Sequence, residues 1–199
     1  MAWHPAGSRV SGSPRFRGKG DAGKLRAIPR TMAKRKAKTV ADSAVEMVEM
    51  VLSNDANPLG NILGGKVMHL IDIAGAIAAH RHAQAQVVTV SVDNLDFVHP
   101  IKVGELIVLR AHVTRAFRTS MEVEVKVFLE DYLTGKRRQT SSAFVTYVAL
   151  DSAGKPAEVP PAIARTAEEK RRYREALERR RWRLAQAARA HRRYFEKEE

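Results

Sequence analysis

One carboxylate lies in the middle of a long apolar segment of this 199-residue chain. Asp72 falls within residues 63–83, which as a helix would be apolar on nearly every side, and such a segment is predicted to be a core helix. A carboxylate in a core is costly unless it is paired, hydrogen-bonded or placed at a cavity. Asp72 is therefore a candidate general base. The alternative is a structural aspartate whose oxygens accept hydrogen bonds from neighbouring groups.

Two glycines, Gly64 and Gly65, lie where this helix is expected to begin. The first N–H groups of a helix lack partners within it and carry the positive end of the helix dipole. The N–H of Gly65 is thus a candidate for polarising a carbonyl oxygen and stabilising an oxyanion. Asp72 lies roughly 10 Å further along the helix axis, too far for one helix to serve a single carbonyl with both groups. We expect a second copy of the chain to complete the site, which suits hydrolysis of an ester or thioester.

Histidines on the same segment raise the question of a metal site. His69 precedes Asp72 by three residues, and His80 and His82 follow it. His80 and His82 are two residues apart and face different sides of a helix. They cannot bind one metal ion together, so no metal site is expected. Arg81 and His82 are instead expected at the end of the helix, where positive charge is favourable. The chain has no Cys, which excludes disulfides, thiolate zinc sites and a cysteine nucleophile.

Alternating patterns elsewhere predict the strands that position this helix. Strands are expected over residues 44–52, 87–97, 105–116, 120–130 and 139–150, with a loop over residues 54–61. The clearest alternation places Met121, Val123 and Val125 opposite Glu122 and Glu124. One helix followed by four strands does not fit repeated βαβ units. It predicts an α+β domain in which an antiparallel sheet wraps around a central helix.

Several separated motifs occur in one order along the chain. They are Asn57-x-x-Gly60-x-x-x-Gly64-Gly65, Asp72-x-x-Gly75-Ala76, Arg81-His82 and the segments 87–97, 120–125 and 142–148. This ordered set resembles the acyl-CoA thioester hydrolases of the hotdog fold. It is most similar to the branch that contains the brain-type cytosolic acyl-CoA hydrolase and its single-domain bacterial relatives. The resemblance covers about residues 44–160.

The resemblance implies a single hotdog domain whose second strand pairs with that of a twofold mate. It implies that water hydrolyses acyl-CoA to a free fatty acid and CoA without a metal or other cofactor. Asn57 and Asp72 would form the catalytic pair from different subunits, with Asp72 as the base and Asn57 orienting water or the carbonyl. Gly65 N–H would polarise that carbonyl. The resemblance further implies a homo-oligomer, a trimer of dimers with six copies.

The predicted substrate-binding residues are Gly64, Thr89, Ser91, Arg137, Arg138 and Ser142. Thr89 and Ser91 interrupt a run of valines, so they line the acyl channel or pair across strands. Arg137 and Arg138 either bind the phosphates of CoA or belong to a solvated turn.

Two other functions are weighed against hydrolysis. One is a catalytically weak, regulatory hotdog protein that binds acyl-CoA and is tethered by basic tails. The other is a hotdog dehydratase, which requires a histidine near the start of the helix, and residues 62–65 contain none. The sequence favours the thioesterase and leaves its preferred acyl chain length open.

The net charge of +13 is concentrated in the two ends of the chain. Residues 1–38 contain 11 basic residues and 1 acidic residue, residues 165–199 contain 13 and 7, and residues 39–164 contain 11 and 14. Basic tails attract polyanions without reading a sequence, so no specific nucleic-acid partner is expected. No apolar run reaches the roughly 18 residues that suggest a membrane span, and no secretory signal is recognisable. A cytoplasmic location is expected.

Three regions are predicted from composition. Residues 1–38 are rich in Arg, Gly, Ser and Pro and are expected to form a disordered basic extension. This extension is compatible with an organelle transit peptide, but we favour a segment upstream of a translation start at Met32. Residues 39–164 are the hotdog thioesterase domain, and residues 165–199 are a basic amphipathic helix.

The C-terminal helix carries one apolar stripe. The stripe consists of Tyr173, Leu177, Leu184, Ala188, His191 and Phe195. We expect it to dock on its own domain or on a symmetry mate. A coiled-coil contact or an anionic surface is the alternative, because the polar face is dense in arginine.

Overall fold

The computed structural model describes residues 36–93 and 95–195, so the predicted disordered extension falls almost wholly outside the described residues, as does residue 94. The strands are β1 (Lys38–Thr39), β2 (Val45–Met50), β3 (Gln86–Asp93), β4 (Leu106–Ala116), β5 (Ser120–Glu130), β6 (Arg137–Leu150) and β7 (Ala162–Ile163). The α-helices are α1 (Gly64–Ala83) and α2 (Ala167–Phe195), with 3-10 turns at Val40–Ser43 and Ser53–Asp55.

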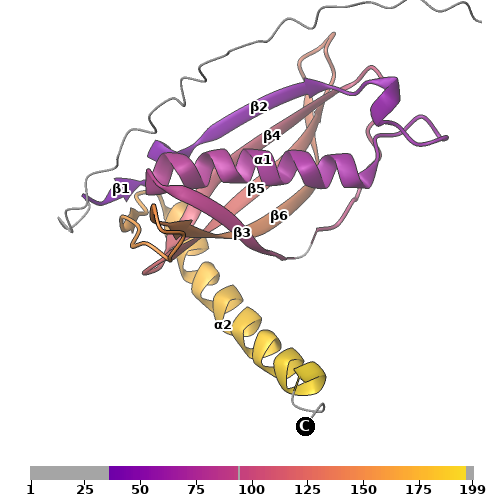
Figure 1. The fold of residues 1–199 in the computed structure, drawn as a ribbon. Helices are drawn as coiled ribbons and strands as arrows, with labels where there is room; N and C mark the ends of the chain where they lie inside the picture. The colour runs from indigo at the N-terminus through magenta and orange to yellow at the C-terminus, as the bar shows by residue number, and fades with distance from the viewer. Residues whose placement is uncertain (1–35, 94, 196–199) are drawn as a thin grey trace, which may run out of the picture. The chain divides into compact units, whose positions relative to one another are not determined.

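Five antiparallel strands form one sheet in the order β2-β4-β5-β6-β3. Helix α1 lies across one face of this sheet (Figure 1). The predicted α+β architecture is therefore confirmed, and β5 has the predicted bounds. β3 ends at Asp93 rather than at residue 97, because Leu95 packs against the core and the ring of Phe97 lies beside Gly64. β1 and β7 form a separate parallel pair that the sequence did not predict.

The core lies between α1 and the sheet. Val67, Leu70 and Ile71 on the helix are buried against inward-facing side chains such as Val123 and Val125. Burying such side chains contributes about 1.5–3 kcal/mol each. The helix was expected to be enclosed on all sides, but only one face of it is covered by the sheet of the same chain.

His82 differs from the sequence prediction. Its ring is buried rather than displayed as a cation at the helix end, and Nε2 lies 2.8 Å from the carbonyl oxygen of Pro160. Burial lowers the pKa of His82, which favours the neutral ring. Arg81 does lie at the helix end, where it donates to the carbonyl of Ala44. Gln84, in the left-handed conformation, ends the helix.

Helix α2 packs against the face of the sheet that is opposite α1. The carboxylates of Glu122 and Glu124 are buried there, although strand alternation alone would leave them in solvent. Three ion pairs join α2 to the sheet: Arg172–Glu124 at 3.0 Å, Arg179–Glu122 at 2.7 Å, and Arg183–Asp93. Arg179 also reaches the second oxygen of Glu122 at 3.1 Å. The docking of α2 is therefore largely ionic.

The predicted apolar stripe explains only the first half of this contact. Tyr173 and Leu177 are partly buried, and Ala176 between them is fully buried. Leu184 and Ala188 are exposed, and Arg183 forms the last ion pair with the sheet that the structure describes along α2. The side chains of His191 and Phe195, which complete the predicted stripe, lie outside the described residues.

A histidine and a glutamate share the buried end of this interface. Burial raises the pKa of Glu124, and the neighbouring Arg172 opposes that effect. Burial and the charge of Arg172 lower the pKa of His112 to about 4. His112 is therefore neutral near pH 7, and Arg172 supplies the positive charge that Glu124 requires.

Replacing Arg179 by alanine is expected to lower the free energy of unfolding by about 3–5 kcal/mol, because it leaves the buried charge of Glu122 without its cation. Thr114, which donates to the same carboxylate at 2.7 Å, cannot replace that charge. Urea unfolding followed by circular dichroism measures the change. Arg181→Ala is the matched control, since Arg181 is exposed on the same helix. Equal losses for the two variants would contradict an ionic docking of α2.

Candidate active site

Asp72 is half-buried on the side of α1 that borders β3 and β6. The hydroxyl of Thr89 donates to Asp72 Oδ1 at 2.6 Å. The hydroxyl of Tyr147 donates to the backbone carbonyl of Asp72 at 2.9 Å and lies 3.4 Å from Oδ1. Within the part of the chain that the structure describes, no cation forms an ion pair with Asp72. Its carboxylate is thus oriented by hydrogen bonds from neutral hydroxyl groups and forms no described salt bridge.

The register of β3 and β6 places both donors at Asp72. Thr89 and Tyr147 lie directly opposite each other in this antiparallel pair, so both side chains point toward α1. A β-bulge between Thr89 and Ser91 then reverses the alternation, and Ser91 is opposite Thr146. Two predicted substrate-binding residues that are two positions apart therefore lie on different faces of the sheet. The hydroxyl of Ser91 donates to Asp93 at 3.0 Å instead.

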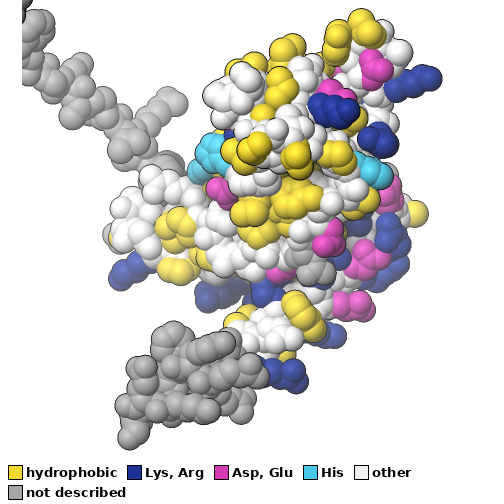
Figure 2. Space-filling model, turned by 90° about the vertical axis from the view of Figure 1, so that its right-hand side faces the viewer, with side chains coloured by type: hydrophobic (Ala, Val, Ile, Leu, Met, Phe, Trp, Pro, Cys, Tyr) yellow, Lys and Arg dark blue, Asp and Glu magenta, His cyan; other side chains and the backbone are white. Residues whose placement is uncertain are grey.

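The sheet edge next to Asp72, and the helix turn before it, carry exposed apolar side chains. Val88, Val90, Val92 and Met68 are between 42% and 55% exposed, and β3 is an edge strand of the sheet. Figure 2 shows hydrophobic side chains gathered in a patch on one face of the molecule. An uncovered edge strand with exposed valines is a surface that proteins ordinarily cover by association.

The helix start has the features that an oxyanion site requires. No side chain of the described residues caps α1, whose N-cap is Leu63. Gly65 is exposed, and a Cβ added there would meet nothing within 4 Å. A Cβ added at Gly64 would meet the ring of Phe97 at ordinary contact distance. The first N–H groups of α1 are thus accessible to a ligand, roughly 10 Å from Asp72 along the axis.

Asn57 belongs to the loop that leads into this helix. Its side-chain oxygen accepts hydrogen bonds from the backbone N–H groups of Leu59 at 3.0 Å and Asn61 at 3.2 Å. Gly60 completes the turn with a φ of +75°, which favours glycine. The side-chain oxygen of Asn57 therefore shapes the loop, and no described contact joins Asn57 to Asp72 within one chain.

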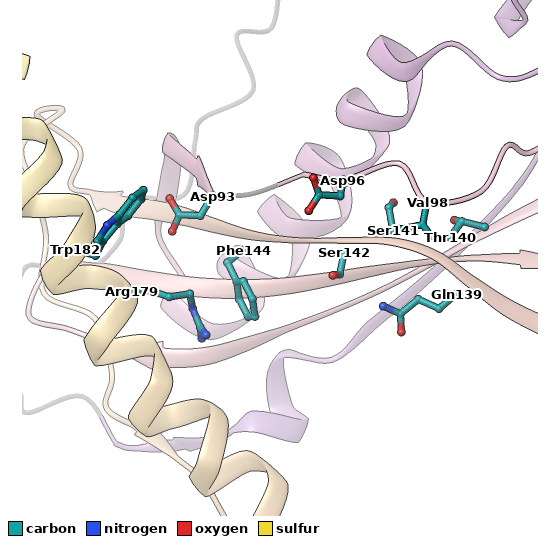
Figure 3. A pocket seen from close by; sticks show the side chains of 10 residues that line it. All are labelled: Asp93, Asp96, Val98, Gln139, Thr140, Ser141, Ser142, Phe144, Arg179 and Trp182. Atoms are coloured by element: carbon teal, nitrogen blue, oxygen red, sulfur yellow. The ribbon is translucent and has the colours of Figure 1, made fainter.

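A pocket of about 390 Å³ opens between α2 and the end of β3 (Figure 3). It is lined by Asp93, Asp96, Val98, Gln139, Thr140, Ser141, Ser142, Phe144, Arg179 and Trp182. Arg179 stacks on the ring of Phe144, with its guanidinium carbon 3.6 Å from the ring centroid. The hydroxyl of Ser141 is buried without a described hydrogen-bond partner.

Ser142 is the predicted site residue that lines this pocket. Arg179 and Trp182, which were not among the predicted site residues, form its wall on the side of α2. The resemblance did not extend to this helix. The signal that was available was an arginine and a tryptophan three residues apart on one helix.

The two arginines predicted to bind phosphates lie far from Asp72 within one chain. Arg137 pairs with Glu46 at 3.0 Å and with Glu130, and these contacts occupy its guanidinium. Arg137 and then Arg110 lower the pKa of Glu46 to about 2. Arg138 is exposed. Ten residues of β6 separate Arg137 from Tyr147, which is about 33 Å at 3.3 Å per residue.

Among residues 36–93 and 95–195, no three or more His, Asp or Glu side chains are grouped so that they could hold a metal ion. No helix in the same part of the chain is both long enough and apolar enough to cross a membrane.

Residues 59–136 match the family model of the Thioesterase superfamily. The chain is 41% identical over 128 residues to the uncharacterised acyl-CoA thioester hydrolase YkhA of Bacillus subtilis, covering 64% of this chain and 74% of that one. It is 34% identical over 146 residues to the acetyl-coenzyme A thioesterase of Rattus norvegicus, covering 73% of this chain. It spans only 26% of the length of that larger relative.

Several solved structures of acyl-CoA hydrolases are similar to this chain in fold and in sequence. The acyl-CoA hydrolase of Bacillus cereus has a TM-score of 0.74 and 36% identity, covering 78% of this chain and 94% of that one. The acyl-CoA hydrolase of Staphylococcus aureus, in complex with butyryl-CoA, CoA and CoA disulfide, has a TM-score of 0.72 and 36% identity, with 77% and 96% covered. An apo-hexameric acyl-CoA thioesterase has a TM-score of 0.74 and 42% identity, with 77% and 98% covered. The expected hotdog fold is confirmed, and the chain belongs to the acyl-CoA thioester hydrolases of the thioesterase superfamily.

Proposed function

We propose that this protein hydrolyses acyl-CoA to a free fatty acid and CoA, with Asp72 as the general base. The proposal rests on the hydrogen bonds of the Asp72 carboxylate. Oδ1 is held by Thr89, whereas no described hydrogen bond reaches Oδ2, which is free to accept a proton from water. The Staphylococcus aureus hydrolase has been solved as variants in which an aspartate, an asparagine or a threonine is changed to alanine. Those three residues are spaced as Asp72, Asn57 and Thr89 are here, which supports the assignment.

The proposed reaction uses water, these side chains and one backbone N–H group, that of Gly65. Water attacks the thioester carbonyl carbon while Asp72 Oδ2 accepts its proton. The N–H of Gly65 donates to the oxygen that becomes negative in the tetrahedral intermediate. The intermediate collapses, the C–S bond breaks, and the proton on Asp72 passes to the CoA thiolate. Asp72 is then ready for another turnover, and we propose that no metal or other cofactor is needed.

We further propose that each site is shared between two protomers. Gly65 and Asp72 of one helix lie too far apart for one carbonyl, and the exposed valines beside Thr89 provide a surface on which a second chain fits. The facing protomer would supply Gly65 and Asn57, whose side-chain amide nitrogen orients water or the carbonyl. A trimer of dimers is the proposed assembly, supported by the hexameric thioesterase neighbour.

The pocket beside α2 is the proposed site for part of the CoA chain. Polar side chains of β6, including Ser142 and Gln139, lie beside the ring of Phe144, and this mixture suits a chain that carries both amide and methylene groups. Arg138 remains the candidate for a phosphate contact, because Arg137 is already paired. The mammalian relatives named cytosolic support a cytoplasmic location.

The test is steady-state hydrolysis of a series of acyl-CoA esters of increasing chain length. Release of CoA is followed with a thiol reagent, and the protein contributes no background because it contains no Cys. We expect turnover that is unchanged by a metal chelator. Binding of acyl-CoA without release of CoA at any chain length would contradict hydrolysis and would favour a regulatory binding protein.

A further inference from the structure

We propose that Tyr147 is a positioning residue for Asp72, and that Gly75 provides the space through which its hydroxyl reaches the helix. This inference rests on the proposed role of Asp72 as the base. Tyr147 is fully buried near the C-terminal end of β6, and its ring spans the distance from the sheet to α1. Its hydroxyl ends 2.9 Å from the backbone carbonyl of Asp72 and 3.4 Å from Oδ1.

The carbonyl that accepts this hydrogen bond already has a partner in the helix. An α-helical carbonyl accepts from the N–H four residues later, so the carbonyl of Asp72 does not need Tyr147 to be satisfied. The contact instead fixes the helix backbone at Asp72, while Thr89 fixes the carboxylate at Oδ1. Backbone and side chain are thus anchored by opposite residues of two neighbouring strands. Together these contacts determine where the carboxylate points.

Gly75 makes this approach possible. A Cβ on Gly75 would lie 2.3 Å from the hydroxyl oxygen of Tyr147 and 3.1 Å from two of its ring carbons. The first distance is impossible for real atoms, so any other residue would force the ring or the helix to move. Gly75 lies three residues after Asp72 on the same helix, and a displacement there therefore carries over to the base.

The hydroxyl remains a donor at the pH of the reaction. Burial, and then the negative charge of Asp72, raise the pKa of Tyr147 far above its usual value. Tyr147 therefore stays protonated. It holds the base and does not act as the base.

The test is Tyr147→Phe, which keeps the buried ring and removes only the hydroxyl. We expect kcat for acyl-CoA hydrolysis to fall about tenfold with KM within twofold, because misplacing a catalytic group by a fraction of an ångström costs rate rather than ground-state binding. Tyr173→Phe, on the partly buried tyrosine of α2, is the matched control and should change kcat by less than twofold. A kcat for Tyr147→Phe within twofold of wild type overturns the proposal.

Two double variants distinguish a positioning role of Tyr147 from a general effect on stability. In the Asp72→Asn background, Tyr147→Phe should leave the residual rate unchanged, since the hydroxyl acts through the carboxylate. A further tenfold loss would show that Tyr147 acts elsewhere. Gly75→Ala should lower the thermal midpoint, and Tyr147→Phe should restore part of that loss by removing the closest atom. Absence of any such rescue would refute the assigned role of Gly75.

The same measurements distinguish the two proposals. If Asp72→Asn keeps wild-type kcat, the base is wrongly assigned, and the positioning role that rests on it falls as well. If Asp72→Asn is inactive and Tyr147→Phe is fully active, the base stands and only the positioning role is refuted.

Discussion

Asp72→Asn is expected to lower kcat for acyl-CoA hydrolysis by about 10²–10⁴, the usual cost of losing a general base. The amide is isosteric with the carboxylate, and its carbonyl oxygen can still accept the hydrogen bond from Thr89. The substrate contacts are unchanged, so KM should stay close to that of wild type. Asp72 is half-buried and forms no described ion pair, so stability should change little.

This result is checked by steady-state kinetics alongside a thermal melt. Asp131→Asn is the control, because the carboxylate of Asp131 accepts hydrogen bonds from Leu133 and Thr134 in an exposed turn that asparagine also forms. The control should retain full activity. If Asp72→Asn remains folded with a kcat within a few-fold of wild type, Asp72 is not the base.

The second large effect is recovery of activity by mixing two inactive variants. A shared site needs Asn57 from one protomer and Asp72 from the other. When Asn57→Ala and Asp72→Asn protomers exchange at random in twofold dimers, half the dimers are mixed and each has one intact site of two. About a quarter of the sites should therefore work, although each parent has none.

A second mixture tests whether the change in activity arises from sites shared between subunits. The double variant, Asn57→Ala with Asp72→Asn, is mixed with wild type under the same conditions. Its mixed dimers contain no intact site, so activity should fall from about one half to about a quarter of the wild-type value. Native mass spectrometry establishes that subunits have exchanged. Exchange without recovery in the first mixture, and without loss in the second, would mean that one chain holds the whole site.

Several elements were predictable because their signal is local. The apolar run with glycines at its start predicted α1 over residues 63–83, and the observed bounds are Gly64–Ala83. Alternating side chains predicted β5, and the order of elements predicted the α+β architecture. These signals are sufficient because a helix or strand must bury one side, and the period of its apolar residues records which side that is.

The neighbours of Asp72 could not be predicted in the same way. Thr89 and Ser91 look equivalent in the sequence, and only the bulge between them directs Thr89 to Asp72 and Ser91 to the other face. Tyr147 lies 75 residues after Asp72 and reaches it only through the register of β6 with β3. A one-residue shift in register would have turned either side chain away.

The environment of the charged residues was also decided by tertiary structure. The alternation of β5 predicted that Glu122 and Glu124 would face away from the core, which they do, but α2 then buries them and pairs them with Arg172 and Arg179. The sequence by itself determined the elements, the central helix and the unusual carboxylate at Asp72. The tertiary structure decided which side chains meet, because contacts between distant segments depend on strand register, bulges and helix docking. The spacing of apolar residues within one element does not indicate any of these.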